Sequence, residues 1–150
     1  MSDIRLHLVP TDPQWTAGAL RVRRALRALR ALVPDAEDVR AERHAEVVFV
    51  DAGGNTERIE CPGCGDTLPE DWWAERMSSA SEQAFRDLAV RTPCCGTVTS
   101  LNDLRYVWPA GFARLALTAH WPARDWLSAD ERDRVAVALG HPVREIRSRV

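Results

Sequence analysis

The sequence contains no lysine, and all 20 of its basic residues are arginines. Arginine offers a rigid, planar set of donors that suits carboxylates and phosphates, so one interpretation is that the arginines serve recognition. The simpler interpretation is compositional, because the chain is also rich in alanine, valine, proline and aspartate, as proteins encoded by GC-rich bacterial genomes are. We therefore expect a bacterial protein and attach no function to the missing lysine.

Long apolar runs are missing too. No stretch approaches the roughly 20 apolar residues of a membrane-spanning helix, and the opening MSDIRLHLVP lacks the basic start and apolar core of a secretory signal. We expect a soluble, cytoplasmic protein without membrane contacts. With 150 residues, 45% of them hydrophobic, the chain is long enough to build its own core, and we expect a single domain over residues 1–150.

Signals for catalysis are scarce. The histidines are scattered, and none has a carboxylate or a nucleophile at a diagnostic spacing; they are His7, His44, His120 and His141. The paired glycines of AGGN predict a turn and not a phosphate-binding loop. No enzyme activity is predicted. The net charge of −2 argues against a protein that coats nucleic acid, because neutralising phosphates requires an excess of positive charge.

The hydrophobic pattern at the two ends of the chain indicates strands and helices in alternation. Alternating apolar residues predict strands over residues 4–9 and 112–120, and a β-branched run predicts another over 46–51. The polar stretch 35–45 is expected to be a connection. Residues 141–150 fit either a helix or a strand.

Two helices flank these strands. The first has an apolar stripe at helical spacing and ends near Pro34, with Asp12 or Thr16 expected as its N-cap. Its stripe consists of Val22, Leu26, Leu29 and Val33. The second helix begins with a capping box, Ser128 with Glu131, and stops at Gly140.

The order of these elements, βαββαβ, predicts an α+β protein of the ferredoxin-like sandwich type, with its helices on one face of the sheet. Residues 52–110 then form an inserted zinc-binding subdomain, zinc-ribbon-like, between the second and third strands. Inside this insertion Pro69 is expected to open a helix, and Ser100 to cap a short turn. The helix has its apolar residues at Trp73, Met77, Ala80 and Ala84.

All four cysteines fall in the insertion, Cys61 and Cys64 in CPGCG and Cys94 and Cys95 in TPCCG. Two thiolates separated by two residues can reach one ion, and the glycine that follows lets backbone N–H groups turn toward sulfur. Zinc takes four nitrogen or sulfur ligands in a tetrahedron, with Zn–S near roughly 2.3 Å. The pattern predicts one structural Zn²⁺ ion held by the four cysteines.

The second half of this motif departs from the first. When CPGCG is aligned with TPCCG, Thr92 occupies the first ligand position and Cys94 falls where Gly63 lies, so Cys95 is the firmer ligand. Two alternatives therefore stay open. One is a three-thiolate site with an open position for water or substrate, as catalytic zinc requires. The other is a redox pair, although disulfides are uncommon in the cytosol.

Two surfaces are candidate interfaces. Trp72 and Trp73 are neighbours on a predicted helix, where successive side chains diverge by about 100°. One of them is therefore expected to face the cysteine turn CPGCG, the zinc knuckle, or a partner. The plainer alternative is packing within the insertion. Arg23, Arg24 and Arg27 lie on the polar face of the first helix and could meet phosphate. The plainer alternative there is a solvated face paired with the acidic residues that follow the helix.

The segments CPGCG, DWW, TPCCG and SLNDLRYVWPAGFARL together resemble a group of small uncharacterised bacterial proteins. That group carries a CPxCG knuckle, a PCCG second half and an SLNDL…WPAGF block. The resemblance covers most of residues 46–120. It implies that the four cysteines act together, which favours the four-thiolate site, and it implies no activity.

From these observations we expect a zinc-stabilised binding or adaptor protein that acts through contacts with a protein partner. One alternative is a nucleic-acid-binding, zinc-ribbon regulatory protein, which would bind with an affinity that falls steeply with salt. The other is a metalloenzyme with an open zinc position. The number of sulfur ligands on the metal separates this last alternative from the other two.

Overall fold

The structure is a computed structural model that describes residues 3–150. Its elements in chain order are β1 (Ile4–Pro10), α1 (Ala19–Leu32), β2 (Asp38–Val50), β3 (Arg58–Glu60), α2 (Glu70–Ser81), β4 (Ala89–Arg91), β5 (Val98–Ser100), the 3-10 turn η1 (Leu101–Asp103), β6 (Arg105–Val107), β7 (Gly111–His120), α3 (Ala129–Leu139) and β8 (Val143–Arg149). Helices combined with antiparallel strands confirm the predicted α+β class. Among the described residues, no helix has the length and apolar character needed to cross a membrane.

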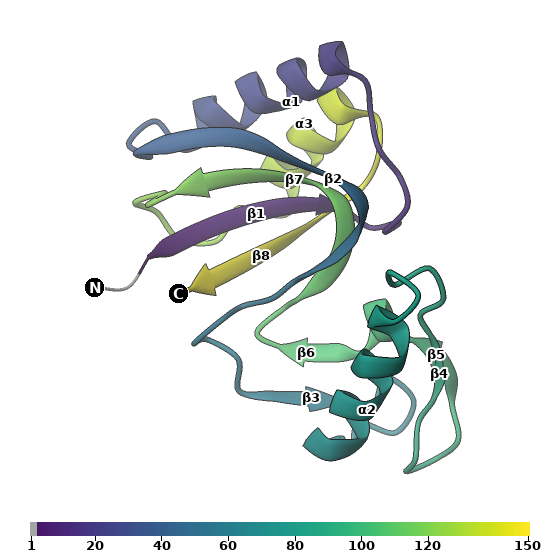
Figure 1. The fold of residues 1–150 in the computed structure, drawn as a ribbon. Coiled ribbons are helices and arrows are strands. Elements are labelled where there is room, and N and C mark those ends of the chain that lie inside the picture. The colour runs from purple at the N-terminus through teal and green to yellow at the C-terminus, as the bar shows by residue number, and fades with distance from the viewer. Residues whose placement is uncertain (1–2) are drawn as a thin grey trace.

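Four long strands form the main sheet, in the order β2-β7-β1-β8, and every neighbouring pair is antiparallel. Helices α1 and α3 lie together over one face of this sheet (Figure 1). The alternation of the strands explains which face they cover: Leu6 and Leu8 of β1 and Leu115 and Leu117 of β7 are fully buried in one core with Leu29 of α1. Burying a leucine side chain contributes roughly 1.5–3 kcal/mol, so this core is the main source of stability for the sheet.

Helix α1 begins later than its predicted caps. Its N-cap is Gly18, which makes no side-chain cap hydrogen bond, so the expectation of Asp12 or Thr16 is wrong. The Asp12 carboxylate instead accepts the backbone N–H of Gln14 at 3.0 Å. Aspartate readily closes such local turns. The Asp12 carboxylate is thus engaged in a turn that precedes the helix and does not cap it.

Helix α3 matches its sequence signals. The Ser128 hydroxyl accepts the Glu131 N–H, the Glu131 carboxylate accepts the Ser128 N–H, and Gly140 ends the helix in the left-handed region at φ +92°. The tail that fitted either element is the strand β8, which pairs with β1 over its whole length.

Strand β2 corrects another expectation. The stretch 35–45 was predicted as a connection, yet β2 starts at Asp38 and pairs with β7. Its pairing shifts between Arg43 and Val48, then resumes as far as Val50, which is opposite Gly111. Beyond this irregularity both strands curve away from the helices toward the insertion (Figure 1).

The insertion, residues 52–110, lies at the end of the sheet where β2 and β7 bend (Figure 1). It contains two short strand pairs, β3 with β6 and β4 with β5, and the helix α2. This helix stops at Ser81, short of the predicted Ala84, which has a left-handed φ of +54°. A second core joins the insertion to the sheet strands, and its buried members are Val47, Cys61, Leu68, Ala80, Leu101, Leu104, Tyr106, Ala110 and Phe112.

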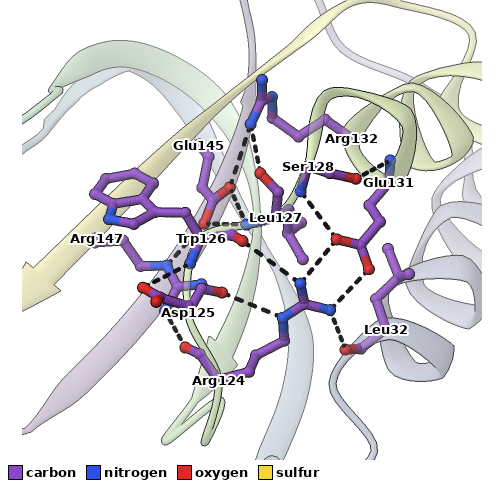
Figure 2. Close-up of polar contacts among 10 residues, drawn as sticks. All are labelled: Leu32, Arg124, Asp125, Trp126, Leu127, Ser128, Glu131, Arg132, Glu145 and Arg147. Atoms are coloured by element: carbon purple, nitrogen blue, oxygen red, sulfur yellow. Dashed lines mark hydrogen bonds and ion pairs between the residues drawn. The ribbon is translucent and has the colours of Figure 1, made fainter.

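A buried charged pair ties the loop before α3 to the sheet (Figure 2). Arg147 donates to the Glu145 carboxylate at 2.7 Å and to the carbonyls of Arg124 and Asp125 at 2.9 and 2.6 Å. Glu145 also accepts the Leu127 N–H at 3.0 Å. Both charges are therefore fully used within the fold, which is the condition under which buried ions are tolerated.

Candidate metal centre

The first cysteine knuckle is a tight turn that follows β3. The Cys61 N–H donates to the Asp66 carbonyl at 2.8 Å, and the Cys61 carbonyl accepts the Gly65 N–H at 2.9 Å. Gly65 has a φ of +81°, a conformation that glycine adopts without strain. The turn also directs the Gly63 N–H at the Cys61 sulfur, 3.3 Å away.

The second knuckle, after β4, repeats the same backbone pattern. The Thr92 N–H donates to the Thr97 carbonyl at 3.0 Å, the Thr92 carbonyl accepts the Gly96 N–H at 3.0 Å, and Gly96 has a φ of +73°. Thr92 thus holds the place that Cys61 holds in the first knuckle. This geometry agrees with the alignment of CPGCG on TPCCG. In that alignment Cys94 is the third residue of its turn, where the first turn has Gly63 and no sulfur.

The four cysteine sulfurs converge at one point between the knuckles. All four Sγ atoms lie within 4.8 Å of one another, with Cys61 and Cys95 3.7 Å apart and Cys64 and Cys94 3.3 Å apart. The cysteines form no disulfide. A tetrahedron with arms of roughly 2.3 Å has edges of about 3.8 Å, so the cluster has the size of a four-thiolate metal site. Within residues 3–150 no other group of three or more histidine, cysteine or acidic side chains converges in this way.

Hydroxyl groups adjust the acidity of the thiols. The Thr92 hydroxyl, 3.4 Å from the Cys61 sulfur, is the main reason that the pKa of Cys61 falls to about 6, and hydroxyl hydrogen bonds from Thr97 and then Thr92 lower the pKa of Cys95. The Asp66 N–H acts to lower the pKa of Cys64, but the adjacent Cys94 sulfur and burial raise it to about 12. Four sulfurs this close ionise together only when a cation lies among them.

The centre connects the second core with the surface. Cys61 is completely buried, whereas Cys64, Cys94 and Cys95 are exposed. One ligand therefore anchors the cluster inside the insertion, and the other three lie on its outer side. A metal ion held here would fix the turn after β3 to the turn after β4.

Contact between the two knuckles also explains why position 63 is a glycine. A Cβ atom at Gly63 would lie 2.1 Å from the Thr97 hydroxyl oxygen and 3.2 Å from the Cys95 sulfur. The first knuckle therefore needs a residue without a side chain where the second carries Cys94. Thr97 was not singled out from the sequence, and the available signal was its position directly after CCG.

The tryptophans proposed as an interface lie on α2. Trp72 and Trp73 both pack in part against the second core, and each remains half-buried. The Trp73 indole N–H donates to the Tyr106 hydroxyl at 3.3 Å. The core that both tryptophans pack against also contains Cys61.

The arginines of α1 divide into two sets. Arg30 donates to the Val39 carbonyl at 3.1 Å, and the guanidinium of Arg21 lies over Gly140 at the end of α3. Three others are exposed and make neither an ion pair nor a side-chain hydrogen bond within the described residues; they are Arg23, Arg24 and Arg27. Pairing of these three with the acidic residues after the helix is not found.

Comparisons of the chain with protein-family models, with curated proteins and with solved structures gave no significant match. The features of this chain that bear on its function are the cysteine centre, the unpaired arginines and the cavities.

Proposed function

We propose that the protein is a zinc-stabilised binding module, an adaptor that acts through protein–protein contacts. In this proposal the main sheet with α1 and α3 is a ferredoxin-like βαββαβ sandwich, and residues 52–110 are a zinc-ribbon-like insertion. The strand order β2-β7-β1-β8, with α1 between β1 and β2 and α3 between β7 and β8, supports the first assignment. The paired knuckles support the second.

The observation that carries the proposal is the convergence of four sulfurs within 4.8 Å. Four thiolates complete a tetrahedral shell and leave no position for water or substrate, so the ion acts as a clamp and not as a reagent. A structural zinc ion of this kind contributes on the order of 10 kcal/mol to folding. Short strand pairs of three residues each, such as β3 with β6, need that contribution because they bury little surface.

X-ray absorption at the zinc edge, together with metal analysis, tests the centre. We expect one zinc per chain, four sulfur neighbours and no oxygen neighbour. Amide exchange before and after chelation then separates the two parts of the molecule: protection should be lost in residues 52–110 and kept in β1 and β7. Protein that folds fully without metal would contradict the clamp, and an oxygen neighbour would favour the metalloenzyme alternative.

The exposed guanidinium groups of Arg23, Arg24 and Arg27 are the proposed contact surface. Their charge has no partner within the described chain, so the complementary surface is acidic. Arginine is also a residue that contributes strongly to binding hot spots. A photo-cross-linker at position 27 should capture a protein partner in cells. Reversing the charge of all three arginines should abolish the capture, and Arg76→Glu on α2 serves as the control.

The same three arginines keep nucleic acid as a second candidate partner. Each phosphate that an arginine neutralises makes the affinity fall more steeply with salt, with a slope of about −0.9 per contact on duplex DNA. Fluorescence anisotropy with DNA and RNA at low and moderate salt measures this slope. Binding that is steep in salt and lost on charge reversal would replace the protein partner by a nucleic acid, and its absence would remove this alternative.

A further inference from the structure

A cavity of about 510 Å³ lies between the bent end of β2 and the insertion. Its size is within the range of about 300–1,000 Å³ that is common for small-molecule sites. No cysteine lines it, so it is separate from the metal centre. Its apolar walls come from β2, β3, α2, β6 and the residues next to them, and their larger side chains are Phe49, Ile59, Leu68, Trp73, Tyr106 and Trp108.

The polar groups of Trp73 and Tyr106 in these walls are already occupied. The Tyr106 hydroxyl donates to the Leu101 carbonyl at 2.6 Å and accepts the Trp73 indole N–H at 3.3 Å. Burial, the largest influence, raises the pKa of Tyr106 to about 12, so this hydroxyl stays neutral. At Trp73 and Tyr106 the aromatic lining therefore offers ring surfaces only, and Trp108 adds its ring and an indole N–H. Ring faces attract cations and apolar groups.

The charged residues of the lining are mainly acidic. They comprise Asp51, Glu57 and Glu70 against a single arginine, Arg58. That arginine is already engaged, because it donates to Glu60 at 2.8 Å and lies 3.7 Å from Glu57. Asp51 accepts the Gly53 N–H but has no ion pair among the described residues, and neither has Glu70. Two carboxylates of the lining thus make no ion pair.

We propose that this cavity binds an organic cation. An ammonium or guanidinium group would be held by Asp51 and Glu70, with its apolar or aromatic body against Trp73 and Trp108. Because the unpaired charge is negative and the walls are aromatic, a neutral molecule of the same shape binds less well and an anion is repelled. The proposal goes beyond the zinc-stabilised binding module and does not depend on the identity of the metal.

Three probes with one ring and three charges test the cavity: phenethylamine, phenethyl alcohol and phenylacetate. Binding to the purified full chain is followed through the indole N–H signals of Trp73 and Trp108 in nitrogen-15 NMR spectra. We expect the amine to bind about tenfold more tightly than the alcohol, and the anion not to bind. An acetylated, amidated Phe-Arg dipeptide forms the second arm. If it binds more tightly than the amine, the cation comes from a partner protein, and the reverse order assigns a free amine.

Charge-removing variants keep the test specific. Asp51→Asn and Glu70→Gln should bring the affinity for the amine down to that for the alcohol and leave the alcohol unchanged. Glu75→Gln, on the same helix but outside the lining, is the matched control. Equal affinities for the amine and the alcohol, indole signals that no probe shifts, or an amine preference that survives both substitutions would each overturn the proposal. Zinc content and the amide spectrum establish that the variants are folded, so the result is independent of the proposed role of the metal.

Discussion

Thr92 holds the position in the second knuckle that Cys61 holds in the first, and its hydroxyl oxygen lies 3.4 Å from the Cys61 sulfur. A ligand is therefore missing from the usual place in the second knuckle, and a sulfur two residues later takes its part. Cys94 reaches the cluster from there, 3.3 Å from Cys64. The centre is a four-sulfur site built on two turns that differ in which of their positions carry sulfur.

This relationship predicts that the ligand can be moved back. Thr92→Cys combined with Cys94→Gly turns the second knuckle into a copy of the first, and we expect it to bind one zinc ion through four sulfurs. Cys94→Gly alone removes one ligand and should weaken zinc binding by more than about tenfold. Competition with a chromogenic chelator measures both. If the double variant binds no better than the single one, the two knuckles are not equivalent.

Gly63→Ala should damage the centre without removing a ligand. Its Cβ atom would meet the Thr97 hydroxyl at 2.1 Å, and overpacking of this kind costs about 1–3 kcal/mol. We expect that loss in the free energy of zinc binding. Adding Thr97→Ala removes the clashing oxygen and should recover part of it. Gly18→Ala is the control, because a Cβ atom there has no neighbour within 4 Å.

The buried pair on β8 predicts a strongly non-additive response. Arg147→Met leaves the Glu145 carboxylate buried without its main partner, which should lower the free energy of unfolding by about 3–5 kcal/mol. Glu145→Gln with Arg147→Met removes both charges and should cost less than the sum of the single changes. Urea unfolding of the four proteins completes the cycle. Arg40→Met, which breaks the exposed pair with Asp38, should cost less than about 1 kcal/mol.

His7 predicts a loss of stability in mild acid. It is buried between the hydroxyls of Thr118 and Ser148, and burial is the main reason that its pKa falls from 6.5 to about 4, with smaller effects from Glu42, which raises it, and from Arg5, which lowers it. As the pH falls, the unfolded chain takes up the proton first. Stability is therefore complete above pH 6.5 and declines until the pH passes about 4, by about 3 kcal/mol in total.

Urea unfolding between pH 7.5 and pH 4 checks this prediction at roughly half-unit steps. His7→Gln removes the titrating group, so its stability should be lower at neutral pH and should vary less over the same interval. His141→Gln serves as the comparison for losing a histidine elsewhere in the chain. An unchanged pH dependence in His7→Gln would assign the effect to other groups.

The features predicted correctly from the sequence are those that depend on neighbouring residues. The capping box of Ser128 and Glu131 and the stop at Gly140 depend on residues within one or two helical turns, and the structure contains both. The four cysteines converge as their spacing predicted. Thr92 shows why alignment of the two knuckles was informative, since the backbone of each turn is closed by hydrogen bonds within six consecutive residues.

Features that depend on distant partners were not predictable in the same way. The start of β2 was missed because charged residues alternate with Val39 and Ala41, whose apolar role is clear only once β7 lies beside them. Glu145 and Arg147 look like surface residues in sequence, yet a loop some twenty residues earlier satisfies both. The carbonyls of that loop accept from Arg147, and its Leu127 N–H donates to Glu145. The cavity forms only where β2, β3, α2 and β6 come together, and no local sequence pattern predicts that arrangement.

The pairing of Val50 with Gly111 has a practical consequence. Everything between these two residues leaves and re-enters the sheet at a single spot, so residues 51–110 could replace the turn of a hairpin in an unrelated host. Such a graft would give up the contacts of this segment with β8, among them the Gly54 N–H to the Arg149 carbonyl at 2.7 Å. Phe49 and Phe112 would have to be transferred with it, because their tilted rings pack with centroids 4.9 Å apart next to this segment. Zinc uptake by such a chimera would show that the transferred segment folds around its metal without the rest of the protein.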